Sequence, residues 1–154
     1  MKIIFVDVDG VLNCEKTTKR LKVNYEFFFV DTCKVLRLRD IVERTGAKLV
    51  LSSTWRLGAD PKAFYIEREA LRELVAEFRR VRCPLWFDVT PCLPHAKRWQ
   101  EINAWLMNHD TDDFIILDDV GEELKPFDDK LVLTNVHDGL TKERAELAIS
   151  LLNK

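Results

Sequence analysis

The sequence predicts an α/β domain of three layers, in which helices cover both faces of a mostly parallel five-stranded sheet. Short apolar runs of strand length alternate along the chain with longer stretches that carry apolar residues at helical spacing. This alternation is typical of parallel strands that are joined by helices. Several of the apolar runs also end in acidic or hydroxyl side chains. Because ligands of such folds bind beyond the carboxyl ends of the strands, these side chains predict a site at that edge.

The composition agrees with one globular domain. The chain has 154 residues, of which 47% are hydrophobic and 32% charged, and its formal net charge is -2. Such a small net charge does not indicate a general affinity for nucleic acid. No apolar stretch approaches membrane-spanning length, and the chain enters a strand directly after Lys2, which argues against a signal peptide. We expect a single domain over residues 1–154, located in the cytoplasm and without contact to a membrane.

The cysteine pattern favours free thiols. No Cys-x-x-Cys pair occurs, and no histidine follows a cysteine at zinc-finger spacing. Reduced thiols in the cytoplasm are the favoured interpretation, with disulfides as the alternative. The four cysteines are Cys14, Cys33, Cys83 and Cys92.

The first strand and the two aspartates behind it form the centre of the predicted site. Residues 3–6 read Ile-Ile-Phe-Val, which is typical of a strand buried on both faces. Because side chains alternate along an extended chain, Asp7 and Asp9 point to the same side, and Gly10 then permits a sharp turn. Two like charges this close are unfavourable unless a cation lies between them, and all-oxygen ligands favour Mg²⁺. A surface turn with two solvated aspartates is the alternative.

A polar, basic insertion over about residues 14–30 precedes the first long helix. Its aromatic run, residues 27–29, is expected to pack in a flap or in the core, with stacking on nucleic-acid bases as the alternative. Its basic residues form either a solvated face or a patch that attracts an anionic substrate. These basic residues are Lys16, Lys19, Arg20 and Lys22.

A helix and a second buried strand follow the insertion. Asp31 and Thr32 are the candidate N-caps of the helix, and Gly46 is its expected C-cap. The strand occupies residues 47–51. If the connection is parallel, the strand brings residues 52–56, Ser-Ser-Thr-Trp-Arg, to the edge where the two aspartates stand.

The polar groups at the end of this strand suit the binding of an anion. A hydroxyl donates a hydrogen bond without adding a charge that competes for a metal. Ser52 is the first candidate and Ser53 the second, with helix capping as the alternative for both. Arg56 is expected either to fork onto a substrate phosphate or to form a salt bridge with a surface acid.

The middle of the chain predicts a long helix and an edge strand. Asp60 and Pro61 read as the N-cap and the first-turn proline of a helix that runs to about Val81. Residues 85–90 form a short strand, which the flanking prolines place near an edge of the sheet. Nothing in this helix indicates catalysis.

The next helix and strand carry the remaining charged candidates. Lys97 and Arg98 stand at the start of a helix, where either a fixed cation or a solvated first turn is expected. Residues 114–117 are a fourth apolar run, and Asp118 and Asp119 follow it at once. This segment repeats the design of the first strand, with acids at the carboxyl end.

A fifth strand and a closing helix end the chain. Residues 131–133 are the last apolar run. After a turn, Thr141 is the expected N-cap of a helix that packs its apolar residues on the sheet.

These segments resemble the motifs of the haloacid dehalogenase (HAD) superfamily. Residues 5–13, Phe-Val-Asp-Val-Asp-Gly-Val-Leu-Asn, are similar to its first motif, and residues 52–56 to its second. The basic pair at residues 97–98 resembles the third motif, a Lys or Arg near a helix start. The acids at residues 118–119 resemble the fourth motif in its paired-aspartate form.

The resemblance extends over essentially the whole chain to a small HAD family named for RNA-repair proteins. It is carried by residues 97–106, with Glu-Ile and Trp-Leu after the basic pair, and by the Gly-Leu-Thr of residues 139–141. Trp99 stands where that family usually has glycine. This departure leaves open which of Lys97 and Arg98 is the functional cation.

The resemblance implies a Rossmann-like sheet in the order 3-2-1-4-5, no large cap domain, and a flap formed by the insertion. It implies that Asp7 attacks phosphorus and forms an aspartyl-phosphate, while Asp9 protonates the leaving oxygen and later activates water. It further implies that Mg²⁺ binds Asp7, the carbonyl of Asp9, and Asp118 or Asp119. Ser52 and the motif cation would hold the transferred group.

Capless HAD proteins commonly act on macromolecules, and the resemblance includes the phosphatase domains of polynucleotide kinase/phosphatase enzymes. The expected activity is therefore that of a Mg²⁺-dependent phosphomonoesterase, with 3′-phosphorylated RNA or DNA ends as the leading substrate. A phosphatase of free nucleotides, small metabolites or phosphoprotein is the alternative enzyme. A metal-binding interaction module without turnover is the alternative outside enzymes.

Overall fold

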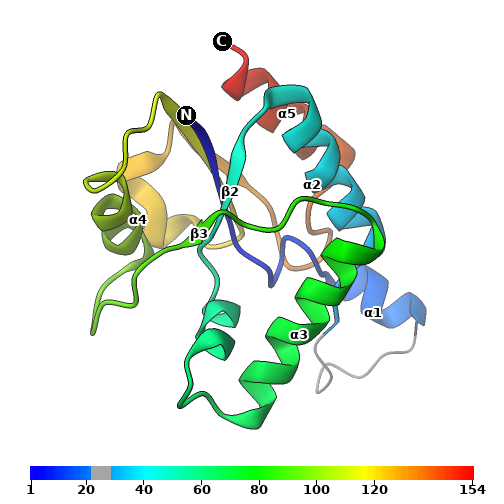
Figure 1. The fold of residues 1–154 in the computed structure, drawn as a ribbon. Helices are drawn as coiled ribbons and strands as arrows, with labels where there is room; N and C mark the ends of the chain where they lie inside the picture. The colour runs from blue at the N-terminus through cyan, green and yellow to red at the C-terminus, as the bar shows by residue number, and fades with distance from the viewer. Residues whose placement is uncertain (22–28) are drawn as a thin grey trace.

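Five parallel strands form one sheet in the order β3-β2-β1-β4-β5, with β1 in the centre (Figure 1). The computed structural model describes residues 1–21 and 29–154. Both the α/β class and the sheet order agree with the sequence prediction. The strands are β1 Lys2–Val6, β2 Lys48–Leu51, β3 Asp88–Val89, β4 Asp113–Asp118 and β5 Leu131–Leu133.

Helices cover both faces of this sheet, with α2 and α5 on one side and α4 on the other (Figure 1). Across the described ranges, no cap domain is present, and no helix is both long and apolar enough to cross a membrane. The α-helices are α1 Glu15–Leu21, α2 Thr32–Thr45, α3 Tyr65–Arg80, α4 Arg98–Leu106 and α5 Lys142–Leu152. Two 3₁₀-helices, η1 Thr54–Ala59 and η2 Gly121–Phe127, follow β2 and β4.

The alternation of side chains along β1 divides the core into two layers. Ile4 and Val6 pack in the layer that contains α2, α3 and α5, whereas Ile3 and Phe5 pack in the layer that contains α4 and η2. All four side chains are fully buried, which explains why residues 3–6 of this strand are all apolar. Since the next odd-numbered residue is Asp7, its carboxylate continues the α4 face beyond the strand end.

The caps predicted for α2 and α5 are present. Asp31 rather than Thr32 is the N-cap of α2, and its side chain accepts a hydrogen bond from the Cys33 N–H. Gly46 ends α2 in the left-handed conformation with φ 69°. Thr141 caps α5 by accepting from the Arg144 N–H.

Two predicted boundaries are wrong. Helix α3 begins at Tyr65, because the Asp60 carboxylate accepts from the Lys62 N–H in a turn and does not cap a helix. The turn lets η1 fold back on α3, where a Cβ on Gly58 would lie 2.3 Å from the Glu67 carbonyl oxygen. Strand β3 is limited to Asp88–Val89, although it does lie at the sheet edge as predicted.

Only part of the basic insertion lies in the described residues. It begins with helix α1, on which Lys16 is exposed. The predictions for Lys22 and for residues 27–28 fall outside the described residues, as do those for the side chains of Lys19 and Arg20. The assignment of residues 14–30 as a flap therefore stays a prediction.

Candidate active site

Three polar residues form a row across the carboxyl ends of the central strands. Val6 pairs with Leu51 of β2 and with Leu117 of β4, so the next residues in register are Asp7, Ser52 and Asp118. The hydrogen-bond ladder continues through them, because the Asp7 N–H donates to the Leu117 carbonyl at 3.0 Å and the Ser52 N–H to the Val6 carbonyl at 2.9 Å. Neighbours in register point to the same face, and all three side chains therefore face the α4 side.

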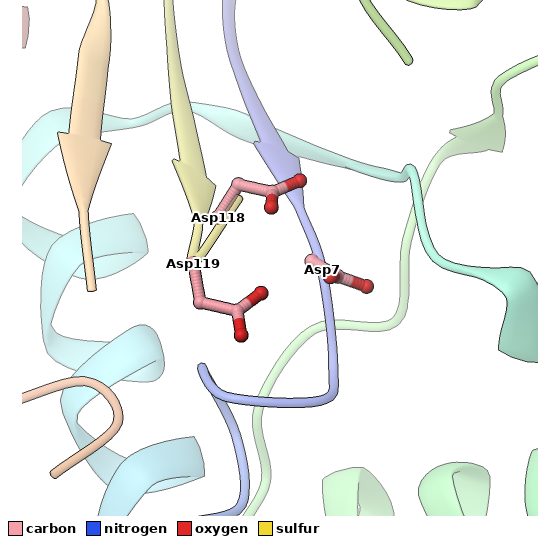
Figure 2. Close-up of side chains that lie close together, drawn as sticks. All are labelled: Asp7, Asp118 and Asp119. Carbon is pink, nitrogen blue, oxygen red and sulfur yellow. The ribbon is translucent and has the colours of Figure 1, made fainter. Parts of the chain in front are cut away.

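Three carboxylates converge at this row. Figure 2 shows Asp7 beyond the end of β1, and Asp118 and Asp119 at the end of β4. One oxygen from each of the three lies within 4.8 Å of the others. Asp7 and Asp118 are buried, with 6% and 0% of their surface exposed, while Asp119 is half-buried.

Burial makes the charged forms of these acids unfavourable. Burial, together with the neighbouring charge of Asp7, raises the pKa of Asp118 to about 7. Burial also raises the pKa of Asp7, although the Arg98 guanidinium opposes this effect. The pKa of Asp119 is raised by burial and by Asp7. The raised pKa values mean that the three carboxylates repel one another when they are ionised, and a bound cation would relieve this repulsion.

The arrangement fits a divalent cation. The Oδ1 atom of Asp118 accepts a hydrogen bond from the Val120 N–H at 2.9 Å. Its Oδ2 atom is buried and, among the described residues, has no hydrogen-bond partner. A buried carboxylate oxygen of this kind is costly unless a ligand takes it up. The donors are all carboxylate oxygens, which are the ligands preferred by Mg²⁺.

Gly10 allows the loop after β1 to approach this cluster. Its φ of +73° lies in the left-handed region, and a Cβ at this position would lie 2.4 Å from Asp119 Oδ2. The Thr134 hydroxyl fixes the turn by donating to the Gly10 carbonyl at 2.7 Å. Glycine therefore suits this position for two reasons: it adopts the left-handed backbone conformation, and it has no Cβ that would collide with the Asp119 side chain.

Arg98 is the cation that lies within the acidic cluster. Its Nη1 atom is 3.4 Å from Asp7 Oδ1, and its Nε atom is 3.6 Å from Asp118 Oδ2. The guanidinium also donates to the carbonyl of Ser52. Lys97 is the exposed N-cap residue of α4, and it forms no ion pair with an acid of the described chain. The geometry thus places Arg98, and not Lys97, beside Asp7.

Both serines lie next to Asp7, but their hydroxyl groups differ. The Ser53 side chain hydrogen-bonds to the Asp7 carboxylate and accepts from the Trp55 N–H at 3.3 Å. The Ser52 hydroxyl is buried and finds no partner within the part of the chain that the structure describes. Ser52 therefore retains a donor that a bound anion can use.

Asp9 stands apart from the three clustered carboxylates. Its Oδ1 atom accepts from the Asn13 amide and its Oδ2 atom from the Trp55 indole N–H, both at 2.9 Å. The side chain is exposed and held in one orientation. Asp9 is thus positioned beside Asp7 but is not a member of the carboxylate cluster.

A comparison with family models identifies the chain. Residues 3–145 match the model described as the HAD domain in Swiss Army Knife RNA repair proteins. The chain belongs to this family. Membership supports a hydrolase, and HAD domains generally use Mg²⁺, for which Asp7, Asp118 and Asp119 offer oxygen ligands. Comparisons with curated proteins and with solved structures found no match.

In this HAD domain Arg56 is part of a separate, buried contact. Its Nε atom donates to the Thr90 carbonyl at 3.0 Å, Nη1 to the Ser53 carbonyl at 2.7 Å, and Nη2 to Glu101 Oε2 at 2.8 Å. Glu101 lies on α4 and is itself mostly buried, so the partner is not a surface acid. Arg56 and Arg98 both line a cavity of about 280 Å³ next to the site. The structure gives Arg56 protein partners, and its contact with substrate stays a prediction.

Three residues that support the HAD site were not assigned a role from the sequence. Asn13 and Trp55 orient Asp9, and Thr134 holds the Gly10 turn. Asn13 and Trp55 do stand within the two motif segments, and their N–H groups are donors that a carboxylate requires. Thr134 follows β5, so only the strand order brings it to Gly10.

Proposed function

We propose that this chain is a Mg²⁺-dependent phosphomonoesterase that forms an aspartyl-phosphate on Asp7. Its leading substrates are the phosphorylated ends of RNA or DNA, with 3′-phosphates first. The observation that carries the proposal is the row of Asp7, Ser52 and Asp118 with Arg98 lying against it. The row and Arg98 together place a nucleophile, a neutral donor and a fixed cation at one edge of the sheet.

Asp7 and Asp9 divide the covalent chemistry. The Val8 N–H and the Ser53 hydroxyl orient the Asp7 carboxylate, with the Val8 nitrogen 2.8 Å from Oδ1. An oxygen of Asp7 bonds to phosphorus while the bond to the leaving oxygen breaks, and Asp9 gives that oxygen a proton. Asp9 then takes a proton from water as the water attacks phosphorus, which releases inorganic phosphate and free Asp7.

Arg98 and Ser52 bind the transferred group. The Arg98 guanidinium lies between two carboxylates and can also donate to phosphoryl oxygens, whose charge it offsets. The unpartnered Ser52 hydroxyl donates a further hydrogen bond without adding charge. Lys97 has no role in this assignment.

Asp7, Asp118 and Asp119, together with the Asp9 carbonyl, are the groups assigned to Mg²⁺. When bound, the ion supplies positive charge that reduces the repulsion between the nucleophilic carboxylate and the substrate phosphate. The raised pKa values of the three acids and the unpartnered Asp118 oxygen support this assignment.

Two observations support a nucleic-acid end as the substrate. No cap domain covers the site in the described residues, so a polymer end has access. The family is named for RNA repair proteins. The choice of 3′-phosphates follows the resemblance to polynucleotide kinase/phosphatase enzymes.

The test is phosphate release in the presence of Mg²⁺ from an aryl phosphate and from a 3′-phosphorylated oligonucleotide. Asp7→Asn is expected to lower kcat by on the order of 10⁴-fold or more, because the nucleophile is lost. Asp128→Asn, the same change at an exposed residue of the described chain, is the matched control. Removal of Mg²⁺ by a chelator is expected to abolish release.

Each outcome has a defined meaning. Unchanged activity in Asp7→Asn would exclude Asp7 as the nucleophile. Activity on the aryl phosphate alone would move the substrate to free nucleotides, small metabolites or phosphoprotein. No phosphate release from either substrate would favour a metal-binding interaction module.

A further inference from the structure

A second cavity lies at the start of α2, on the opposite face of the sheet from Arg98. We call it the α2 cavity, and its volume is about 220 Å³. Three basic side chains, Lys16, Lys34 and Arg37, line it together with the acids Asp31 and Asp138. The lining thus carries three basic groups and two acids.

Two of the three basic groups already have protein partners. Lys16 Nζ pairs with Asp138 Oδ1 at 2.9 Å, and this pair lowers the pKa of Asp138. Arg37 Nη1 donates to the Leu140 carbonyl at 2.8 Å. Both groups are therefore already bonded to the protein, and Asp138 has a basic partner.

The other acid of the cavity is satisfied by neutral donors. Asp31 Oδ1 accepts from the Cys33 N–H at 2.9 Å, and Oδ2 accepts from the Thr17 hydroxyl at 2.5 Å. Asp31 is thereby fixed as the N-cap of α2 and does not form an ion pair with Lys34. Among the described residues that line the cavity, Lys34 is thus the basic group whose side chain has neither a hydrogen bond nor an ion pair.

Lys34 is a mostly buried residue that has no counter-charge in the described part of the chain. Only 6% of its surface is exposed, and within the described residues its ammonium group forms no hydrogen bond or ion pair. Its stem lies against Gly139, which has a φ of +63° and where a Cβ would be 2.7 Å from Lys34 Cε. A glycine at this position therefore makes room for the lysine. Because the stem is buried while the ammonium group lines the cavity without a described protein partner, this group can bind an anion that enters the cavity.

Asn13 lies near both the stem of Lys34 and the side chain of Asp9. The Asn13 carbonyl oxygen lies 3.1 Å from the same position of a Cβ on Gly139, while its side chain donates to Asp9. Lys34 is in the first turn of α2, and α2 follows β1 in a parallel crossover. The start of α2 therefore lies at the same sheet edge as Asp7.

We propose that the α2 cavity binds a second phosphate of the same substrate, a backbone phosphodiester near the terminal phosphate, through Lys34. The inference rests on the proposed function, because it assumes that Asp7 acts on a nucleic-acid end. A second phosphate distinguishes a polymer end from a single nucleotide, which has only the phosphate that reacts. Arg37, which the Leu140 carbonyl holds at the side of the cavity, adds positive potential.

The test compares Lys34→Met with Lys48→Met in an Asp7→Asn background, so that no turnover occurs. Methionine keeps the length of the stem and removes the charge. Lys48 is exposed and begins β2, at the opposite edge of the sheet. Affinity for a dye-labelled, 3′-phosphorylated single-stranded RNA is measured by fluorescence anisotropy at several salt concentrations, and a nucleoside 3′-monophosphate serves as competitor.

Lys34→Met is expected to raise the Kd for the RNA about tenfold, the size of one charge-assisted hydrogen bond. It should also reduce the slope of log Kd against log salt by about 0.7. The Ki of the nucleoside monophosphate should change less than the Kd of the RNA, since it lacks the second phosphate. Lys34→Arg, which restores the charge, should recover affinity for the RNA.

Equal effects of Lys34→Met and Lys48→Met would overturn the inference. If Lys34→Met does not fold, the protein without the Lys34 substitution still decides, because equal affinity for one phosphate and for the polymer also excludes the second site. The two proposals fail separately. Phosphate release with no dependence of RNA affinity on Lys34 removes only the α2 cavity, whereas RNA affinity that depends on Lys34 without any turnover removes only the phosphatase.

Discussion

Helix α4 contributes to two buried clusters of charge that differ in how completely they are paired. In the first, Arg56 donates to three carbonyl oxygens and to Glu101 at 2.7 to 3.4 Å. In the second, Arg98 lies 3.4 and 3.6 Å from its two carboxylates, beyond ordinary hydrogen-bond distance. Both clusters place an arginine beside acids, and both are largely closed to solvent.

The difference separates a structural contact from a site that awaits a ligand. Arg56 and Glu101 satisfy each other, and neither has a buried unpartnered atom. In the acidic cluster Asp118 keeps an oxygen without a hydrogen-bond partner among the described residues, and its pKa is raised to about 7. Native proteins rarely leave such groups unmatched without a functional reason. Completeness of pairing, and not proximity of charges, therefore favours Arg98 over Arg56 for the proposed chemistry.

The largest expected effect is the loss of stability in Arg56→Met. Removal of the guanidinium leaves Glu101 buried beside α4 without its counter-charge. Breaking a buried pair from one side typically costs about 3–5 kcal/mol in the free energy of unfolding. Urea unfolding followed by circular dichroism measures this change.

The double variant Arg56→Met/Glu101→Met is the control for this experiment. It removes both charges, and replacing both partners of a buried pair by apolar groups is often close to neutral. We expect it to recover most of the stability that Arg56→Met loses. A single-variant loss below about 1 kcal/mol would show that the contact is not a structural unit.

The next effect is on catalysis and concerns Arg98. Arg98→Met is expected to lower kcat by about 10²–10³-fold, because a preorganised charge at the transferred phosphoryl group is lost. Its stability should fall less than that of Arg56→Met, since Arg98 is less completely paired. Lys97→Met serves as the matched control, with activity within about twofold of wild type. The reverse result, in which Lys97 carries the activity, would contradict the comparison.

The sheet and the row of site residues could be predicted because both follow from local pattern and strand register. Apolar runs placed the strands, and parallel pairing then brought Asp7, Ser52 and Asp118 together. The α3 boundary could not be predicted in this way. An Asp-Pro pair reads as a helix start, but the Asp60 side chain can equally close a turn on Lys62.

The choice between Lys97 and Arg98 was also beyond the sequence. Consecutive residues of a helix point about 100° apart, so the direction in which α4 packs decides which one meets Asp7. Arg56 posed a similar problem, since its role depends on Glu101, 45 positions further along the chain. Contacts between elements, and not residue types, settle such cases.

The smallest effect concerns the stability of the acidic cluster without metal. Burial raises the pKa of Asp118 from 3.8 to about 7, so ionisation of this group opposes folding. The penalty is absent below about pH 4, grows as the pH rises, and is complete above pH 7. Asp118→Asn cannot ionise, and we expect it to be more stable than wild type at pH 8 by at least about 1.4 kcal/mol, the free energy of one of the roughly three pKa units.

Thermal unfolding in a chelator at pH 8 and at pH 4 measures this difference, with Asp128→Asn as the exposed control. The advantage of Asp118→Asn should vanish at pH 4, because the wild-type carboxyl is then largely protonated in the folded protein. Mg²⁺ at pH 8 should raise the Tm of wild type more than that of the variant, since a bound cation offsets the same repulsion. A variant less stable than wild type at pH 8 would mean that the acidic cluster is as fully paired as Arg56.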